Sequence, residues 1–339
     1  MSPEYPKDAV SEISSPDLPV IFLMGPTASG KTALAIELVQ SGGYEIISVD
    51  SAMVYQQLDI GSAKPTDQEI LLAPHHLIDF IDPKEAYSAA DFCRDARELI
   101  NQIHGRGKTP LLVGGTMLYF KALKQGLADL PAADEKVRAG LSHQLNQRGI
   151  AALHQELAQV DPQTAERLHT NDTQRILRAL EVFQVSGKAL SLWHAEQTLS
   201  ALPNPVLSIA LAPEDRSQLH KKIEARFDSM IKQGLLDEVA SLYYRGDLDL
   251  DCPAMKSVGY RQIWQYLAGE LKLSEAIERA VIATRQLAKR QYTWLRSWPE
   301  VEWFDPQQPL QLKAVTQRIA EFVNAHSKQN SDQQSVDNL

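Results

Sequence analysis

Cysteine and long apolar runs are the scarcest features of this sequence. Its 339 residues include two cysteines, Cys93 and Cys252, so a disulfide framework is excluded and neither thiol has a role that the sequence assigns. No run approaches the roughly 18 apolar residues that a membrane span needs. The polar first residues lack the basic and apolar parts of a secretion signal. We therefore expect a cytoplasmic protein with no membrane partner.

Basic charge is also in deficit, since 34 Lys and Arg stand against 43 Asp and Glu, a formal net charge of −9. Hydrophobic residues make up 44% and charged residues 23% of the chain, which excludes wholesale disorder and a fibrous chain. Taken alone, the acidic balance argues against nucleic acid or an anionic membrane as a partner. Net charge does not show where the charges lie, so single segments have to be inspected.

Apolar and polar patterns divide the chain into parts. Residues 1–17 are polar and predict a flexible arm. Residues 18–125 and 200–323 alternate short apolar runs with helical patterns and predict an α/β core with a parallel sheet. Residues 126–199 predict a helical insertion, and residues 324–339 a disordered tail. The predicted strands are Val20–Met24, Glu45–Val49, His76–Ile81, Leu111–Val113 and Val206–Leu211; predicted helices include Thr32–Gln40 and Ser88–Ile103, and residues 214–323 are expected to be mostly helical.

A phosphate-binding loop is the strongest signal. The segment Gly25-Pro-Thr-Ala-Ser-Gly30-Lys31-Thr32 fits the pattern of a glycine, four residues and then Gly-Lys-Ser/Thr, between an apolar strand and a helix. Small residues let backbone N–H groups curl around phosphate oxygens, and the positive end of the next helix points at the same anion. Lys31 adds a cation, and the Thr32 hydroxyl is placed to hold Mg²⁺. The pattern indicates phosphate without specifying ATP.

Asp50 follows the second predicted strand, in Ile46-Ile-Ser-Val-Asp50-Ser51. Ligands of parallel sheets collect at the carboxyl ends of the strands, so Asp50 is expected to face the phosphate site. It could order Mg²⁺ through water, act as a general base, or simply cap the next turn. Asp79 and Asp82 are weaker candidates for the metal role.

A second glycine-containing loop, Val113-Gly114-Gly115-Thr116, follows the fourth predicted strand. Two glycines at a strand end let a backbone approach a ligand closely, and Thr116 would then offer its hydroxyl. The alternative is tight packing between strand and helix, with Thr116 as a helix N-cap.

Several segments occur together with these loops. They are Ser48-Val-Asp50-Ser51 with Val54-Tyr55, Gly114-Gly-Thr116 with Leu118-Tyr119, Asp172-Thr-Gln174-Arg175-Ile-Leu-Arg178-Ala-Leu-Glu181, Arg226-Phe-Asp-Ser-Met230 with Gly234-Leu235, and Lys256-Ser-Val-Gly259-Tyr260-Arg-Gln262. With the phosphate loop, the set resembles the tRNA dimethylallyltransferase (tRNA isopentenyltransferase) family of bacterial type over roughly residues 20–298. The resemblance implies an α/β fold with a P-loop NTPase-like parallel sheet flanked by helices, a helical insertion domain and a helical C-terminal part.

The resemblance also implies a reaction. A dimethylallyl group would pass from dimethylallyl diphosphate to the exocyclic N6 amine of the adenosine 3′-adjacent to the anticodon, in tRNAs reading codons that begin with U. Asp50 would be the general base, Arg226 a cation for the leaving diphosphate, and Thr116 a hydrogen-bonding partner near the amine. The diphosphate would lie on Gly25, Pro26, Thr27, Ala28, Ser29, Gly30, Lys31 and Thr32, with Mg²⁺ as cofactor at Thr32.

Basic charge gathers in one segment despite the acidic total. Residues 256–298 hold eight Lys and Arg against three acidic residues, a net charge of +5. Arg285, Lys289, Tyr292 and Arg296 share one helical face, which is typical either of a solvated surface or of a surface that tracks phosphates and stacks a base. The resemblance favours RNA. The residues expected to contact tRNA are Asp50, Ser51, Ala52, Met53, Thr116, Arg138, Gln174, Arg175, Ile176, Leu177, Arg178, Met255, Lys256, Ser257, Val258, Gly259, Tyr260, Arg285, Lys289 and Arg290.

Two other classes of protein remain as alternatives. A small-molecule P-loop kinase or an adenosine-phosphate isopentenyltransferase would not need the helical insertion or the basic C-terminal segment. A nucleotide-gated RNA-binding protein would need a pocket for a nucleotide base that the sequence does not indicate. The expected partners are therefore the anticodon stem-loop of tRNA and dimethylallyl diphosphate, and a monomer is expected.

Overall fold

The computed structural model describes residues 13–128, 130–196 and 201–336, with backbone only from residue 328 onwards. Most of the predicted arm, residues 1–12, lies outside the described residues. The chain divides into two compact units. The core unit comprises Met1–Lys121 and Pro203–Leu339, and the helical unit comprises Ala122–Leu202. The helical unit thus occupies nearly the residues of the insertion predicted at 126–199.

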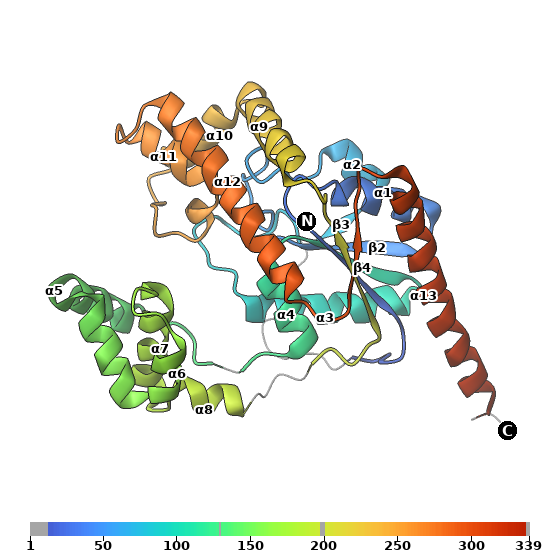
Figure 1. Cartoon of the computed structure of the whole chain (residues 1–339), viewed down its shortest axis with the longest axis horizontal. Helices are drawn as coiled ribbons and strands as arrows, with labels where there is room; N and C mark the ends of the chain where they lie inside the picture. The colour runs from blue at the N-terminus through green and yellow to red at the C-terminus, as the bar shows by residue number, and fades with distance from the viewer. Residues whose placement is uncertain (1–12, 129, 197–200, 337–339) are drawn as a thin grey trace. The chain divides into compact units, whose positions relative to one another are not determined.

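A six-stranded parallel sheet forms the centre of the core unit (Figure 1). Its strand order is β3-β2-β4-β1-β5-β6. The strands are β1 (Val20–Met24), β2 (Tyr44–Val49), β3 (His75–His76), β4 (Thr109–Gly114), β5 (Val206–Leu211) and β6 (Val301–Phe304). The central strands β1 and β4 are buried along their whole length, as expected where helices cover both faces. The predicted α/β fold class is confirmed.

Helices cover the sheet on both faces. On one face α1 (Lys31–Ser41) and α13 (Pro309–Val336) contribute Leu34 and Ile319 to a buried cluster with the strands. On the other face lie α3 (Ala89–Gly105) and α4 (Met117–Gln125), where the rings of Phe22 and Phe120 are 5.0 Å apart. Ser88 caps α3 through a reciprocal pair of bonds with Asp91, which explains why that helix starts where the sequence predicts.

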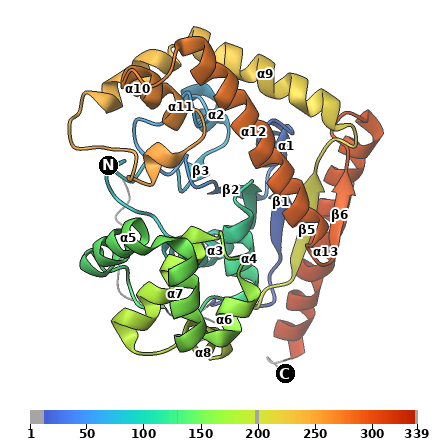
Figure 2. The ribbon, with the colours of Figure 1, turned by 60° about the vertical axis from the view of Figure 1, so that its left-hand side comes forward.

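A second buried cluster of the core unit lies beside the carboxyl ends of the strands. Tyr55 and Leu58 pack there against four helices, which Figure 2 shows as one group. These helices are α9 (Arg216–Gln233), α10 (Leu235–Tyr243), α11 (Tyr260–Leu267) and α12 (Leu273–Arg296). A 3₁₀ turn (Ala254–Lys256) belongs to the same cluster, whereas the short α2 (Asp67–Leu72) contacts α1. The long α12 brings the basic segment of the chain to this end of the sheet.

The helical unit has a core of its own. Its helices are α5 (Glu135–Val160), α6 (Pro162–Arg167), α7 (Thr173–Ser186) and α8 (Leu190–Ala195). Leu153, Leu157 and Ile176 are fully buried in it. Gly149 interrupts α5 with a φ of 75°, a left-handed conformation that glycine adopts at little cost.

The structure differs from the sequence predictions in three places. Only His75–His76 form a strand where His76–Ile81 was predicted, because Leu77 and Asp79 have positive φ and turn the chain away. The edge strand β6 was not predicted. The tail predicted as disordered at residues 324–339 is helical as far as Val336, in α13, and residues 337–339 lie outside the described residues. In the described part of the chain no helix has the length and apolar character of a membrane span.

Candidate active site

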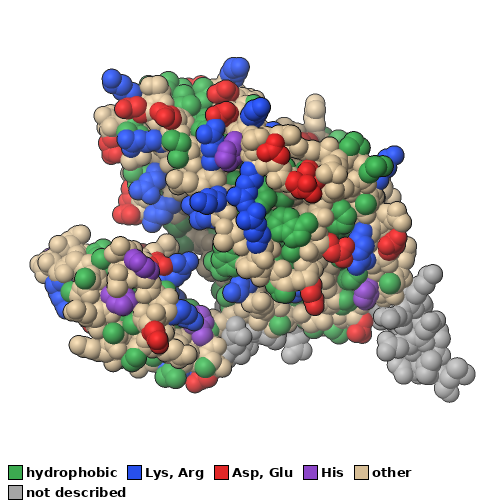
Figure 3. Space-filling model, in the orientation of Figure 1, with side chains coloured by type: hydrophobic (Ala, Val, Ile, Leu, Met, Phe, Trp, Pro, Cys, Tyr) green, Lys and Arg blue, Asp and Glu red, His purple; other side chains and the backbone are tan. Residues whose placement is uncertain are grey.

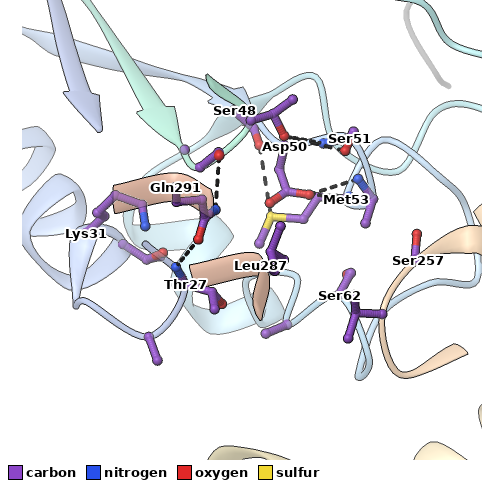
Figure 4. A pocket seen from close by; sticks show the side chains of 18 of the residues that line it. Thr27, Lys31, Ser48, Asp50, Ser51, Met53, Ser62, Ser257, Leu287 and Gln291 are labelled. Atoms are coloured by element: carbon purple, nitrogen blue, oxygen red, sulfur yellow. Dashed lines mark hydrogen bonds between the residues drawn. The ribbon is translucent and has the colours of Figure 1, made fainter. Parts of the chain in front are cut away.

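A cavity of about 890 Å³ lies where β1, β2 and β4 end, and all of its lining residues belong to the core unit. The three loops that follow these strands line it, together with α9 and α12. Figure 4 shows Lys31, Asp50 and Gln291 around the same space. The topology of the sheet has therefore brought together segments that are far apart in the sequence, as parallel sheets do at the ends of their strands.

The phosphate loop has the backbone that an anion site requires. Ala28 and Gly30 both have left-handed φ, 63° and 93°, which curls the loop ahead of α1. Gly30 is the N-cap of α1 and offers no side chain to its first N–H groups. A helix start without a capping side chain leaves backbone donors open to an anion. A Cβ on Gly25 would lie 2.3 Å from the Leu211 carbonyl oxygen, so the entry to the loop needs glycine.

Two cations face this loop. Lys31 Nζ donates to the Pro26 carbonyl at 2.7 Å. The pKa of Lys31 is lowered from its usual 10.5 to about 7, mainly by burial and also by Arg226, with Asp50 partly offsetting both effects. Burial also lowers the pKa of Arg226, again partly offset by Asp50. Among the described residues neither cation has a carboxylate at ion-pair distance, and the negative charge that acts on both is that of Asp50.

Asp50 lines the cavity and also shapes the turn that follows it. One carboxylate oxygen, Oδ1, accepts hydrogen bonds from the backbone N–H of Ala52 at 2.8 Å and of Met53 at 3.2 Å (Figure 4). Oδ2 accepts none from the described residues and stays available to a ligand. The capping role and the site role considered for Asp50 are thus compatible, because each uses a different oxygen.

Thr116 joins the loop after β4 to the loop after β2. Its Oγ1 accepts a hydrogen bond from the Ser51 backbone N–H at 3.1 Å. Gly114 is required by packing rather than by a ligand, since a Cβ there would lie 2.0 Å from the Val49 carbonyl oxygen. The structure therefore supports tight packing as the reason for Gly114, with Thr116 directed to the same cavity as Asp50.

Gln291, on α12, is a site residue that sequence reasoning missed. Its side chain is buried, accepts a hydrogen bond at Oε1 from the Thr27 backbone N–H at 3.0 Å, and donates from Nε2 to the Gly115 carbonyl at 3.0 Å (Figure 4). A Cβ on Gly115 would lie 2.2 Å from that Nε2. Gly115 is thus explained by the space that Gln291 occupies. No motif marks a lone glutamine 264 residues from its partner.

Glu238 is a second residue that the sequence did not indicate. Its carboxylate accepts hydrogen bonds from the backbone N–H groups of Ile60 and Gly61, at 2.7 and 3.0 Å, and from the Tyr260 hydroxyl at 2.5 Å. Gly61 lines the cavity and has no room for a side chain beside the Tyr260 ring. Glu238 thus fixes the loop that borders the cavity.

The residues predicted to contact tRNA in the core unit fall into two groups. Ser51, Ala52, Met53, Thr116, Lys256, Ser257, Val258 and Arg290 line the cavity together with Asp50, and Lys289 is exposed. Met255 and Tyr260 have fully buried side chains and Gly259 is buried, so contact with RNA at these positions stays a prediction. Arg285 pairs with Glu224.

Tyr292 does not offer its ring to a base as the sequence suggested. It is buried, and its hydroxyl donates to the Pro213 carbonyl at 2.7 Å, while Arg216 lies 5.0 Å above the ring. The predicted face of α12 is therefore split, because its aromatic residue points into the protein. Figure 3 shows that Lys and Arg side chains nevertheless gather on the surface over α9 and α12.

The predicted RNA contacts of the helical unit are also divided. Gln174 and Arg175 are exposed and Leu177 is half-buried, whereas Ile176 is fully buried and cannot present its side chain to RNA. Arg138 and Arg178 both pair with the buried carboxylate of Glu181, at 2.8 and 2.9 Å. Arg175 pairs with Asp172.

The weaker metal candidates lie elsewhere. Asp79 pairs with Lys64 at 2.7 Å and Asp82 with Arg245 at 3.0 Å, and neither lines the cavity. Within the described residues no group of three or more His, Cys, Asp or Glu is arranged to hold a metal ion. Both cysteines are free.

The fold and the site together define a class of protein. A parallel sheet with a phosphate loop, two unpaired cations and a carboxylate at its strand ends is the architecture of an enzyme that transfers a group from a phosphorylated donor. The chain belongs to the IPP transferase family, whose family model matches residues 53–298, and the isopentenyl transferase model matches residues 18–79. It is accordingly a prenyl-transferring enzyme.

Solved structures show the same relationship. The full-length tRNA isopentenylpyrophosphate transferase of Bacillus halodurans is 37% identical, with a TM-score of 0.68 over 93% of this chain and 99% of that one. The tRNA delta(2)-isopentenylpyrophosphate transferase of Staphylococcus epidermidis is 33% identical, with a TM-score of 0.64 over 91% and 99%. A eukaryotic dimethylallyltransferase acting on tRNA is 29% identical, with a TM-score of 0.73 over 85% and 74%.

Proposed function

We propose that this prenyltransferase moves a dimethylallyl group from dimethylallyl diphosphate to the N6 amine of the adenosine 3′-adjacent to the anticodon, in tRNAs reading codons that begin with U, and releases diphosphate. The observation that carries the proposal is the meeting of the phosphate loop, Asp50, Thr116 and Arg226 in one cavity. The solved relatives that act on tRNA support the acceptor. We expect the enzyme to act as a monomer in the cytoplasm.

The diphosphate of the donor would occupy the phosphate loop. Backbone N–H groups from Ala28 to Thr32 would donate to its oxygens, since the start of α1 has no capping side chain. Lys31 and Arg226 would stabilise the negative charge that grows on the leaving diphosphate. Their side chains already lie at the loop, so little reorganisation is needed during the reaction.

Mg²⁺ is the proposed cofactor, with Thr32 as its ligand from the protein. The Thr32 hydroxyl lies in the first turn of α1 and lines the cavity, and it supplies the hard oxygen that Mg²⁺ prefers. Because no carboxylate cluster surrounds it among the described residues, the remaining ligands would be diphosphate oxygens and water. Bound there, the ion would supply additional positive charge to the leaving group.

Asp50 is the proposed general base. The exocyclic amine of adenine is a weak nucleophile and must lose a proton as it attacks the allylic carbon. Oδ2 is free to accept this proton, while the two hydrogen bonds to Oδ1 hold the carboxylate in place. Thr116, fixed by the Ser51 backbone, would hydrogen-bond near the same amine. The adenine would have to leave its stack to reach these groups.

The proposed tRNA contacts are the exposed and cavity-lining members of the predicted set. In the core unit Lys256, Lys289 and Arg290 would bind phosphates, and in the helical unit Gln174 and Arg175 would do so. Neutralised phosphates release counterions, so tRNA affinity should fall steeply with salt. A flat salt dependence would refute this footprint.

A transfer assay with Asp50→Asn tests the proposal. The protein is incubated with dimethylallyl diphosphate, Mg²⁺ and unmodified tRNA, and prenylated adenosine is measured by mass spectrometry. We expect Asp50→Asn to lower kcat by about 10²–10⁴-fold while donor binding is retained, because only proton removal is lost.

The matched control is Asp79→Asn, which removes a carboxylate outside the cavity and should transfer at the wild-type rate. Near-normal transfer by Asp50→Asn would refute its role as base. Transfer to free adenosine phosphates in place of tRNA, or ATP hydrolysis without transfer, would refute the proposed function itself.

A further inference from the structure

Gln291 connects the two loops on which the proposed reaction depends. The phosphate loop follows β1 and the loop carrying Thr116 follows β4, and these neighbouring strands are paired as far as Met24 and Gly114. The Gln291 side chain bridges them, with 3.0 Å to the Thr27 backbone N–H and 3.0 Å to the Gly115 carbonyl. Its amide is therefore shared between the proposed donor site and the proposed acceptor site.

Burial and hydrogen bonding both favour retention of the two Gln291 hydrogen bonds when a ligand binds. Gln291 is only 7% exposed, and both of its polar atoms are satisfied by backbone groups. Without it, the Thr27 N–H and the Gly115 carbonyl would each lose a partner, which is costly where water is excluded. Gly115 leaves room for Nε2 that a side chain would fill.

We propose that Gln291 is a positioning residue that sets the spacing between the diphosphate of the donor and the acceptor amine. The inference rests on the proposed function. Both polar atoms of Gln291 bond to backbone groups, so it acts through Thr27 and Gly115, and with them through the donor loop and Thr116. Transfer requires the allylic carbon and the amine to meet within van der Waals contact, and a misplacement of about 1 Å costs on the order of 10²-fold in rate.

On α12, Gln291 directly follows two cations that are proposed to bind tRNA. Arg290 precedes it and also lines the cavity, and Lys289 is exposed on the same helix. The cations proposed to bind tRNA and the bridge to the donor loop therefore lie at successive positions of one helix.

Two substitutions separate this role from simple packing. Gln291→Met keeps the length of the side chain but makes neither hydrogen bond. Gln291→Glu keeps the acceptor for the Thr27 N–H, but an ionised carboxylate cannot donate to the Gly115 carbonyl. When protonated, the introduced carboxyl regains that donor. Burial raises the pKa of the introduced carboxyl, and the cations Lys31, Arg226 and Arg290 that line the same cavity lower it, so the pH series extends below 6 until the carboxyl is protonated.

The experiment measures single-turnover transfer by the full-length enzyme with dimethylallyl diphosphate, Mg²⁺ and unmodified tRNA. We expect Gln291→Met to lower the rate constant for transfer by about 10- to 100-fold, with tRNA affinity close to wild type and with Tm lowered, because two backbone groups lose their partners. Gln291→Glu should be equally slow near pH 8, and its rate relative to wild type should rise as the pH falls. Taking the ratio at each pH removes the pH dependence that the two enzymes share.

Gln311→Glu is the matched control, because Gln311 also accepts from a backbone N–H, that of Asp305, and donates to an oxygen, that of Gln308, away from this cavity. Its rate relative to wild type should not change with pH. A Gln291→Met enzyme with the wild-type rate constant for transfer, or a Gln291→Glu enzyme whose ratio does not depend on pH, would overturn the positioning role. If the wild-type chain itself transferred nothing to tRNA, the proposed function would fail and this inference with it.

Discussion

Two cations that line the cavity of the core unit differ from two arginines of the helical unit in whether they have an ion-pair partner. In the cavity, Lys31 and Arg226 have no ion-pair partner among the described residues. In the helical unit, Arg138 and Arg178 share the buried carboxylate of Glu181. Lys31 and Arg226 are therefore available to a bound anion, whereas Arg138 and Arg178 already pair with a carboxylate of the protein.

This difference follows from what a buried charge costs. Lys31 and Arg226 are half-buried at the wall of the cavity, where partial loss of hydration disfavours a charge without a partner, so unpaired cations there indicate a site for an anionic ligand. The arginines of the helical unit are partly exposed and are held in place by Glu181, so they could contact phosphate only beside or instead of that carboxylate. The comparison predicts that cavity cations serve the reaction and that Glu181 and its arginines serve the fold.

The largest loss of activity in this comparison is expected for Arg226→Met, which removes one of the two cations that face the phosphate loop. We expect it to lower kcat by about 10²–10³-fold, because one preorganised charge at the leaving diphosphate is removed, with little change in Tm. Arg226→Lys should recover part of the rate. The control is Arg216→Met on the same helix, since Arg216 lies over the Tyr292 ring outside the cavity. Wild-type turnover by Arg226→Met would show that the unpaired cation is not used.

Glu181→Gln addresses the other side of the comparison. It removes a buried carboxylate that pairs with two arginines and also accepts from the Asp134 backbone N–H at 3.1 Å. We expect urea unfolding to show a loss of about 1–3 kcal/mol, with kcat unchanged.

Glu156→Gln provides the reference for that measurement. It removes one partner of the more exposed pair with Arg148 in the same unit, and such pairs contribute about 0–1 kcal/mol. Equal losses for the two variants would mean that Glu181 has no special structural role.

The parts of the fold that the sequence predicted are those with local signals. β1, β2, β4 and β5 are short apolar runs, and the phosphate loop is a pattern of eight consecutive residues, so each is recognisable without knowing its neighbours. Asp50 and Thr116 were predictable because both follow such strands. β6 escaped because Val301–Phe304 is a four-residue edge strand in which no residue is fully buried, and its apolar run is interrupted by Glu302.

The rest of the site depends on long-range contacts that no local pattern reports. Gln291 meets Thr27 and Gly115 only because α12 crosses the strand ends, and Glu238 reaches the loop at Gly61 from α10. Residues within one motif also face different ways. Tyr292 lies between Lys289 and Arg296 in the sequence but packs against Pro213, because a spacing of three or four residues does not say which face of a helix is buried.

Lys31 allows a finer test of the unpaired cations. Its pKa of about 7 in the free protein, lowered by burial and by Arg226, leaves most molecules neutral at about pH 8. A bound diphosphate supplies negative charge, which raises that pKa and draws a proton onto Lys31. Donor affinity should therefore fall as the pH rises above 7, by at most about tenfold per pH unit.

Calorimetry in two buffers of different ionisation heat would measure this uptake directly. At about pH 8 the last ionisation of the donor diphosphate is largely complete, so a net uptake approaching one proton would come from the protein. Lys31→Arg should bind the donor without taking up a proton, since a guanidinium is charged at every accessible pH. Equal proton uptake by wild type and Lys31→Arg would show that a group other than Lys31 binds the proton. No proton uptake by wild type would mean that Lys31 is already charged in the free enzyme. The desolvation free energy of that charge would then reduce the stability of the protein before the donor binds.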